Sequence, residues 1–473
     1  MRRAEGKPTT DVGRMPASCS PLPAIRRILT DRTLEKCSLD CRFGRTIIRM
    51  DTNQIIAIVI FVVVMLAIMT EKLHRSLAAI VGAMVVLALH VMPFDAAMEH
   101  IDFNTLGVLL GMMLFVSVVK LSGVFEYLAI KSARIARGDP WKIMLLFVLL
   151  TAVLSAFLDN VTTVLLIGPM TLTVCRLLDI NPIPFFMTEI MASNIGGTAT
   201  LIGDPPNIMI GSAAGFTFLD FIMMDAPAVV VILAAILIVF YFMYGRSMKV
   251  NDEERARVME LDERTYIKDA RLLKLSVVMT GVVVVGFMGH GALGLESSII
   301  ALGVAGITIL LSGTSIEDAL SQVEWTTLSF FAGLFVIVGA LAETGVIGML
   351  ANGLVDMTGG NVFVTMLVLL IGSAVISSFL DNIPFVATMI PILLTMEASG
   401  MDVTPLWWAV SLGACLGGNG TLIGASANVV LSDISKKFGY EITFMGFFKT
   451  AFPIMLLTVL MAGVYLVLRF PAA

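Results

Sequence analysis

The sequence has little charge and few cysteines. Only 14% of its 473 residues are charged, whereas 58% are hydrophobic. A soluble protein of this length could not bury so much apolar surface, so the chain needs a bilayer as its solvent. Three of the five cysteines, Cys19, Cys37 and Cys41, precede the apolar part. Because only Cys175 and Cys415 remain there, no disulfide framework or zinc site is expected.

Long apolar runs fill the rest of the chain. Several approach the roughly 20 residues that a spanning helix needs, and they lack the alternation of barrel strands. We therefore predict an all-α polytopic membrane protein with about ten transmembrane helices and two re-entrant hairpins. The predicted spans lie near residues 54–70, 76–93, 105–122, 185–209, 227–244, 272–289, 295–312, 327–342, 405–430 and 450–468.

Two further apolar stretches, 141–176 and 363–397, each hold an Asp-Asn pair at the centre. About 35 residues at 1.5 Å per residue are too few for two full spans, so we interpret both as re-entrant hairpins. A carboxylate at bilayer depth is unfavourable unless it faces a cavity or a partner, which makes Asp159 and Asp381 candidate functional residues. A purely capping role for both is the alternative.

Basic residues are unevenly distributed over the predicted loops. From Met50 on, 19 Lys and Arg fall on one side of the map and one, Arg469, on the other. The positive-inside rule places the first side, with the charged stretch 245–274, in the cytoplasm. Residues 1–49 hold 11 Lys or Arg against 5 Asp or Glu, yet the map puts them outside. We therefore expect translation to start at Met50; a disordered tail or a processed targeting segment is the alternative.

The sequence also repeats itself. A shift of 222 residues superposes Ser155–Asn160 on Ser377–Asn382, and a shift of 221 superposes the glycine-rich stretch Gly196–Asn207 on Gly417–Asn428. Five predicted spans separate the copies, so their orientations in the membrane are opposite. We predict a basic tail over 1–49, a first inverted repeat over 50–244, a cytoplasmic linker helix over 245–274 and a second repeat over 275–473. Inverted repeats with broken helices are typical of secondary transporters.

The glycine-rich stretches cannot be continuous helices, because both contain paired glycines and threonines and the first also contains Pro205 and Pro206. Irregular backbone in a membrane must line a cavity. We expect each to face a hairpin tip and to complete one ion site per repeat. The acids Asp204 and Glu189 have no acidic counterpart in the second copy and are the candidate proton carriers. The candidate substrate- or ion-binding residues are Asp159, Asn160, Thr162, Thr163, Asn194, Gly196, Gly197, Thr198, Thr200, Asp204, Asn207, Asp381, Asn382, Gly417, Gly418, Asn419, Thr421 and Asn428, with Na⁺ expected at Asp159, Asn160, Asp381 and Asn382.

Basic residues are absent from both glycine-rich stretches and from the second hairpin. No Lys or Arg occurs between Arg176 and Arg246 or between Lys274 and Lys436. We therefore expect a site with acids only, which rejects a citrate-like trianion and accepts a neutral hydroxide or a small cation. Cys415 could offer sulfur to trivalent arsenic, although a small buried cysteine more often serves packing.

Four motifs carry a family resemblance: SAFLDNVTT from Ser155, ASNIGGTATLIGDPPN from Ala192, and their second copies SSFLDNIP and GGNGTLIGASAN. They resemble the ion transporter superfamily, in the branch of arsenical pump membrane proteins (ArsB), NhaD-type Na⁺/H⁺ antiporters and the melanosomal P protein, over residues 50–470. In the related dicarboxylate carriers the hairpin tips read Ser-Asn-Thr; here Asp159 and Asp381 replace the Ser. The resemblance implies an elevator-type carrier with a dimerising scaffold domain and a sliding transport domain.

The resemblance also implies a function. Proton-coupled efflux of arsenite or antimonite across the inner membrane is the first hypothesis, Na⁺/H⁺ exchange the second, and a carboxylate permease or a channel is less favoured. An enzyme is not expected, because no HExxH or GxSxG motif stands in a span. We expect no cofactor beyond H⁺ and Na⁺ as coupling ions. The expected partners are a small inorganic substrate, membrane lipid, a second copy of the chain and a soluble ATPase as in some arsenical pumps, with no nucleic acid.

Overall fold

The computed structural model describes residues 50–70 and 73–471. Within these ranges the regular secondary structure is helical, with no strand, which confirms the predicted all-α class. The chain from Asp51 onward forms one compact unit. The predicted basic tail over 1–49, and with it the predicted start of translation, concerns residues outside the described part.

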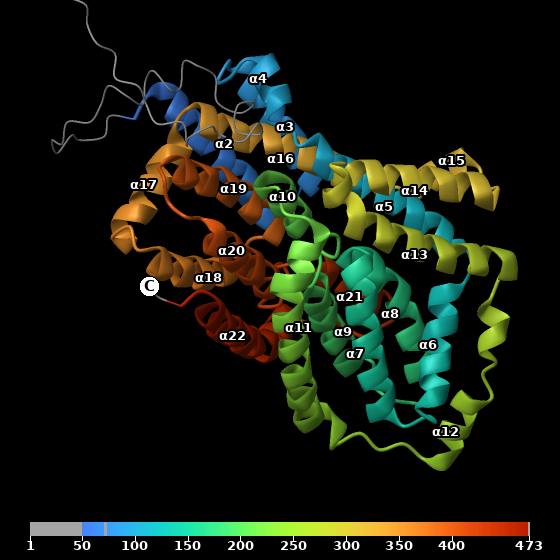
Figure 1. The fold of residues 1–473 in the computed structure, drawn as a ribbon. Coiled ribbons are helices and arrows are strands. Elements are labelled where there is room, and N and C mark those ends of the chain that lie inside the picture. The colour runs from blue at the N-terminus through green and yellow to red at the C-terminus, as the bar shows by residue number, and fades with distance from the viewer. Residues whose placement is uncertain (1–49, 71–72, 472–473) are drawn as a thin grey trace, which may run out of the picture. The chain divides into compact units, whose positions relative to one another are not determined.

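In the described part the helices form two successive sets of ten, separated by a short linker (Figure 1). The first set is α2 (Thr52–Met69), α3 (Arg75–Ala88), α4 (Phe94–Glu99), α5 (Phe103–Leu121), α6 (Val124–Ile135), α7 (Pro140–Phe157), α8 (Asn160–Leu177), α9 (Ile183–Gly197), α10 (Pro205–Ala214) and α11 (Phe218–Phe240). The second set is α13 (Ala270–Leu293), α14 (Ser297–Ser312), α15 (Ile316–Ser321), α16 (Trp325–Glu343), α17 (Val346–Thr358), α18 (Val362–Phe379), α19 (Asn382–Ala398), α20 (Thr404–Gly417), α21 (Ser426–Lys437) and α22 (Phe444–Arg469).

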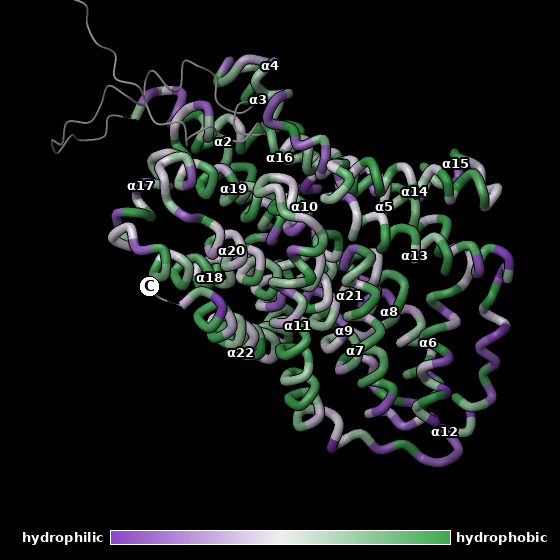
Figure 2. Tube along the Cα trace, viewed as in Figure 1, coloured by the Kyte–Doolittle hydropathy of each residue, from purple (hydrophilic) through white to green (hydrophobic). Residues whose placement is uncertain are grey.

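The linker is less regular than the single helix that the sequence suggested. It contains the π-helical turn η2 (Tyr241–Gly245), the short helix α12 (Asp252–Met259) and the 3₁₀ turn η3 (Glu263–Tyr266). Its charges pair with α6: Glu263 forms an ion pair with Arg134, and Lys268 with Glu126 at 3.2 Å. Figure 2 shows the hydrophilic residues concentrated around α12.

Helices of the first set pack against helices of the second set. α14 of the second set packs along α5 of the first, and α3 of the first packs along α16 of the second (Figure 1). Within each set, the first hairpin arm packs on the helix that follows the hairpin, α7 on α9 and α18 on α20. A pseudo-two-fold axis between two inverted repeats would produce such reciprocal packing.

Nine helices of the described part are long and apolar enough to cross a membrane: α2, α5, α7, α8, α11 with η2, α13, α16, α18 and α22. Four shorter apolar helices accompany them, α3, α14, α17 and α19. Hydrophobic residues predominate along helices α11, α13 and α14 (Figure 2). The chain is therefore a multi-pass membrane protein.

Both predicted hairpins are present. α7 and α8 flank the first Asp-Asn pair, and α18 and α19 flank the second. The arms have 18, 18, 18 and 17 residues, so three of them are long enough to span on their own. The number of residues therefore does not exclude full spans, contrary to the prediction from sequence. The inward position of the tips, described below, is the better reason to regard the hairpins as re-entrant.

Candidate functional site

Each hairpin turns at an Asp that caps the second arm. Leu158 has extended backbone angles (φ −117°, ψ 160°), which ends α7. Asp159 then accepts hydrogen bonds from the backbone N–H of Thr162 at 2.8 Å and from its hydroxyl at 2.5 Å. Asp381 accepts one from the backbone N–H of Ile383 at 3.0 Å. The capping role, which the sequence left as the alternative, is therefore present at both tips.

The glycine-rich stretches do interrupt their helices, as predicted. The first broken segment, 198–204, separates α9 from α10, and the second broken segment, 418–425, separates α20 from α21. Pro205 occupies the first position of α10, where its missing N–H leaves no hydrogen bond unmade. All residues from 198 to 204 are buried or nearly so, which places irregular backbone inside the protein.

Glycine lets the hairpins reach these segments. A Cβ on Gly196 would lie 2.2 Å from the carbonyl oxygen of Ala152 on α7. A Cβ on Gly417 would lie 2.6 Å from the Cα of Ala374 on α18. Real Cβ atoms do not approach backbone so closely, so both contacts require glycine. These two candidate residues therefore serve helix packing.

Asn207 holds the first broken segment together. Its Nδ2 donates to the carbonyl oxygens of Thr198 (3.2 Å) and Thr200 (3.0 Å). Its Oδ1 accepts from the hydroxyl of Ser411 at 2.8 Å, with the thiol of Cys415 at 3.5 Å. Both ends of the amide are engaged, so in this conformation Asn207 fixes the backbone and leaves no free ligand atom.

Asn428 plays the matching part in the second repeat. Its Nδ2 donates to the carbonyl oxygens of Gly418 (2.8 Å) and Thr421 (2.9 Å). Its Oδ1 accepts from Nδ2 of Asn194, which lies 2.9 Å away and also donates to Oδ1 of Asn419 at 2.9 Å. This amide cluster joins the two repeats at the centre of the protein.

Both hairpin tips converge on a single carboxylate, Asp204, at the end of the first broken segment. Nδ2 of Asn160 lies 3.3 Å from Asp204 Oδ1. Nδ2 of Asn382, from the other repeat, lies 3.3 Å from Oδ1 and 3.1 Å from Oδ2. Asp204 is fully buried. We had expected one ion site per repeat; the contacts instead form one shared, asymmetric site, because Ala425 occupies the equivalent position in the second repeat.

The expectation of a site with acids only is wrong. Arg75, at the start of α3, reaches the second tip, where its Nη1 lies 3.5 Å from Asp381 Oδ2. The guanidinium also donates to the hydroxyl of Ser426 and, at 3.3 Å, to that of Thr327, and it lies over the ring of Phe330. Sequence reasoning placed Arg75 in a loop, because local charge patterns do not reveal which distant elements a loop contacts.

A cavity of about 20 Å³ opens beside the tips, large enough for one water-sized species. Arg75 and three carboxylates line it, those of Asp159, Asp204 and Glu324. With Asp381 beside Arg75, four acids surround one base. Such an arrangement favours bound protons or cations over anions.

Other candidate residues lie around this centre. The hydroxyl of Thr198 donates to the carbonyl oxygen of Asn194 at 2.7 Å, and that of Thr421 to the carbonyl oxygen of Ser378 at 2.5 Å. The hydroxyl of Thr162 donates to Asp159, and that of Thr200 donates to the carbonyl oxygen of Ala156 on α7 and accepts from the N–H of Gly203 at 3.1 Å. Thr163 is buried without a partner for its hydroxyl. Gly197 and Gly418 form part of the tight turns, and a Cβ on either would crowd the facing segment.

Glu189 lies apart from the central cluster. It is buried on α9 and accepts from the hydroxyl of Thr171 on α8 at 2.5 Å, and its second oxygen has no partner. It does not line the cavity beside Asp204. The structure therefore separates the two acids that the sequence treated as equal candidates.

Sequence reasoning missed several polar residues of the site: Arg75, Asp225, Glu324, Ser411 and Ser426. Two signals were available. Asp225 is an acid two residues before the predicted apolar span 227–244. Glu324 stands 222 residues after Asp102, and both acids occupy the N-cap position of a helix, Asp102 of α5 and Glu324 of α16. The two serines carry no distinguishing pattern.

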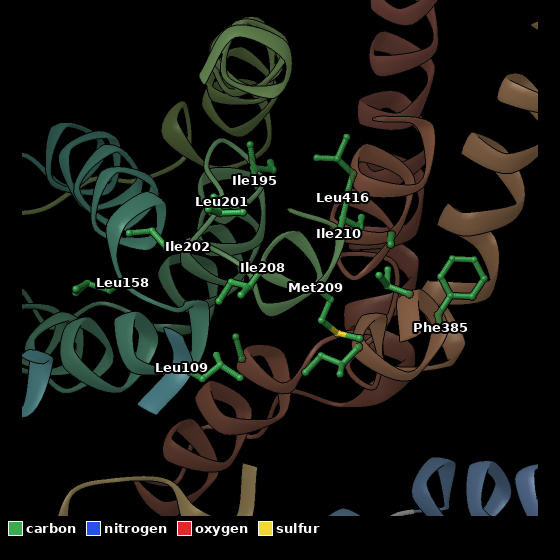
Figure 3. Packing of buried hydrophobic residues seen from close by; sticks show 14 of the residues in the cluster. Leu109, Leu158, Ile195, Leu201, Ile202, Ile208, Met209, Ile210, Phe385 and Leu416 are labelled. Carbon is green, nitrogen blue, oxygen red and sulfur yellow. The ribbon is translucent and has the colours of Figure 1, made fainter. Parts of the chain in front are cut away.

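Apolar side chains from both repeats enclose the polar centre. Figure 3 shows Ile195, Leu201 and Ile208 of the first repeat packed near α10, with Leu416 and Phe385 of the second repeat on the other side. Such a shell excludes water and strengthens the polar contacts inside. Within the described residues, no group of three or more His, Cys, Asp or Glu side chains is arranged to hold a metal ion.

The helical fold, the exchanged repeats and the buried polar centre define a multi-pass secondary transporter. The citrate transporter family matches residues 65–413. The chain belongs to this family, within the ion transporter superfamily that its motifs resemble.

Two of the three similar proteins below are described as transporters, and none of the descriptions names a substrate. The chain is 44% identical to an uncharacterized transporter of Mycobacterium bovis, with 88% of this chain and 98% of the relative covered. It is 34% identical to the human P protein over 88% of this chain and 60% of that protein, so it spans about three fifths of the P protein. The YdaH transporter of Alcanivorax borkumensis has a similar fold, with a TM-score of 0.57 at 14% identity over 89% of this chain and 99% of the other. The crystal structure of that transporter is described as revealing an unusual topology.

Proposed function

We propose that the protein is a proton-coupled secondary transporter in which Asp204 carries the coupling proton. The observation that supports this most strongly is the convergence of both hairpin tips on this one buried carboxylate. No Lys, Arg or His forms an ion pair with Asp204 among the described residues; it accepts hydrogen bonds from the side-chain amides of Asn160 and Asn382. A buried carboxylate without a cationic partner is most stable when it holds a proton or a cation.

The contacts also suggest how a proton couples to movement. An ionised Asp204 accepts from Asn160 and Asn382 together and so draws the tips of the two repeats to one point. A proton on one oxygen turns that oxygen into a donor, which then competes with an amide N–H. Proton binding therefore changes how firmly each tip is held, as alternating access requires. A sliding transport domain, as in elevator carriers, would carry the tips and the broken segments as one body.

For the substrate we propose a small neutral hydroxide, with arsenite as the first candidate, because four acids around one base disfavour a trianion. The cavity of this conformation holds only a water-sized species, so it must widen to admit arsenite. Cys415, in contact with Asn207, supplies a single sulfur near the centre. Na⁺/H⁺ exchange is the second candidate, because clustered carboxylates suit a small cation equally well. A carboxylate substrate is less favoured, although the family is named for citrate, because Arg75, the basic group at the cavity, is already paired with Asp381.

We place the protein in the inner membrane with the linker 245–274 in the cytoplasm, because 19 of 20 loop Lys and Arg fall on that side of the map. A second copy, bound through the scaffold helices, and surrounding lipid are the partners that the family resemblance suggests. A soluble ATPase would be an additional partner if the substrate is arsenite. H⁺, with Na⁺ as the alternative, serves as coupling ion.

Flux measurements in proteoliposomes test this proposal. Purified protein is reconstituted with a pH-sensitive dye inside, a proton gradient is imposed, and arsenite, NaCl or citrate is added in separate experiments. We expect arsenite to dissipate the gradient and to accumulate against its own gradient. Dissipation by Na⁺ alone would favour the antiporter, and dissipation by citrate alone would contradict the charge argument.

A further inference from the structure

A second buried acid, Asp225, stands behind the first broken segment. It lies on α11 and is fully buried. Its Oδ2 is 2.7 Å from the hydroxyl oxygen of Ser411 on α20, and that same oxygen is 2.8 Å from Oδ1 of Asn207. The other carboxyl oxygen, Oδ1, has no hydrogen-bond partner. Asp225, Ser411 and Asn207 thus form a row of hydrogen-bonding side chains, which runs from α11 through α20 of the second repeat to the first broken segment.

Whether Asp225 carries a proton determines which hydrogen bonds these three side chains can form. The amide orientation of Asn207 is fixed, because its other end faces the carbonyl oxygens of Thr198 and Thr200 and must therefore be the NH₂ group. Oδ1 of Asn207 can then only accept. The hydroxyl of Ser411 has one hydrogen and faces two acceptors. All contacts are satisfied when Asp225 is protonated, donates to Ser411 Oγ, and Ser411 donates to Asn207.

We propose that Asp225 is a second proton-binding site, and that its proton holds the first broken segment in the conformation seen here. When that proton leaves to solvent, the Ser411 hydroxyl turns to the carboxylate, and Asn207 Oδ1 keeps only the weak thiol donor of Cys415. The amide that fixes Thr198 and Thr200 then loses its anchor. The inference rests on the proposed function only for its consequence, a second proton per transport cycle.

The two repeats differ at this point, which argues against a purely structural role. Aligning Thr217 with Thr443 and Pro227 with Pro453 places Ala451 at the position of Asp225. In the second repeat the equivalent amide oxygen, that of Asn428, accepts from the non-titrating Asn194. The same backbone arrangement is thus built once with an acid and once without.

The surroundings offer Asp225 no basic partner. None of the ion pairs in the described ranges involves it. The titratable or charged groups on the elements packed against α11 are Glu189 (α9), Tyr241 and Tyr244 (η2), Arg271, Lys274 and His290 (α13), Cys415 (α20), and Lys449, Tyr465 and Arg469 (α22). None of these groups forms a hydrogen bond with Asp225 in the described ranges, where its one partner is Ser411; the Tyr465 hydroxyl donates to the neighbouring carbonyl of Met224 at 2.7 Å.

Infrared spectroscopy tests the proton site without any transport assay. The full chain in lipid nanodiscs at neutral pH should show the C=O stretch of protonated carboxyl groups. We expect Asp225→Asn to remove part of this band. The matched control is Asp356→Asn, which changes an exposed acid on α17 and should leave the band unchanged. A band of the same area in wild type and Asp225→Asn would overturn the proposal.

Thiol labelling tests the coupling to the segment. The modification of Cys415 by a membrane-permeant maleimide is followed against pH by peptide mass spectrometry. Labelling should rise more steeply with pH in the wild type than in Asp225→Asn, which keeps a donor to Ser411 at every pH and reports the intrinsic response of the thiol. Ser411→Ala should raise labelling at all pH values, and remains informative if Asp225→Asn folds poorly. Identical pH profiles in wild type and Asp225→Asn would overturn the coupling.

Discussion

Asp159 accepts two hydrogen bonds from Thr162 and also lines the cavity, so at the scale of single residues its capping and ion-binding roles must be separated. Asn caps helices about as well as Asp, whereas Ala does not. We predict that Asp159→Asn keeps the thermal stability of the protein but abolishes proton-coupled flux, whereas Asp159→Ala lowers both. Stability is measured by thermal unfolding in detergent and flux in proteoliposomes. Normal flux in Asp159→Asn would leave Asp159 with the capping role alone.

Arg75 and Asp381 form an ion pair whose side chains are 25% and 10% exposed. Removing the guanidinium leaves Asp381 almost buried without its cationic partner. We predict that Arg75→Gln destabilises the protein by about 1–3 kcal/mol. Because the cause is an unpaired charge, adding Asp381→Asn should restore much of the loss.

A double-mutant cycle measured by thermal unfolding checks this prediction. The pair Arg75→Gln with Asp356→Asn, which removes an exposed acid far from the site, is the control and should show no rescue. Additive losses in the Arg75–Asp381 cycle would show that the ion pair contributes nothing of its own.

At the scale of helices, the contact between α7 and α9 depends on Gly196. A methyl group there would meet Ala152 backbone, which cannot move aside as a side chain can. We predict that Gly196→Ala destabilises the protein by about 1–3 kcal/mol or prevents folding. Gly372→Ala, on the hairpin arm α18 where a Cβ meets nothing within 4 Å, is the control and should be neutral or slightly stabilising. Equal unfolding temperatures of the two variants would contradict the packing described here.

The helical elements were predictable from sequence because their signals are local. Apolar runs and Gly-Pro breaks located the spans, and the matched Asp-Asn pairs located both hairpins, since polar residues at bilayer depth repeat only under constraint. The site was predictable in part: Asp204, Asn160 and Asn382 were candidates, and the first glycine-rich stretch was expected to face a hairpin tip, but the approach of Asn382 from the other repeat was not foreseen. Arg75 was missed because its partners Asp381 and Ser426 lie in the other repeat, and no sequence pattern couples residues so far apart.

At the scale of the whole molecule, the orientation in the membrane follows from the distribution of basic residues. We predict that a cysteine introduced at Ser247, in the exposed linker before α12, is inaccessible to an impermeant thiol reagent in intact cells and reacts in inverted vesicles. A cysteine at the exposed Met357, at the end of α17, is a comparison position that reports on a different loop. Reaction of the linker cysteine in intact cells would show that the protein has the opposite orientation in the membrane to the one predicted here.

The proposed transport mechanism depends on Asp204 as the group that couples proton movement to transport. Its most direct test compares two modes of flux in proteoliposomes containing wild-type protein or Asp204→Asn. In the first mode a proton gradient drives substrate accumulation; in the second, labelled substrate exchanges across the membrane with no gradient. Asn keeps the size of the side chain and mimics the neutral acid. We predict that Asp204→Asn loses gradient-driven accumulation and retains exchange, whereas gradient-driven accumulation at the wild-type level would contradict the account.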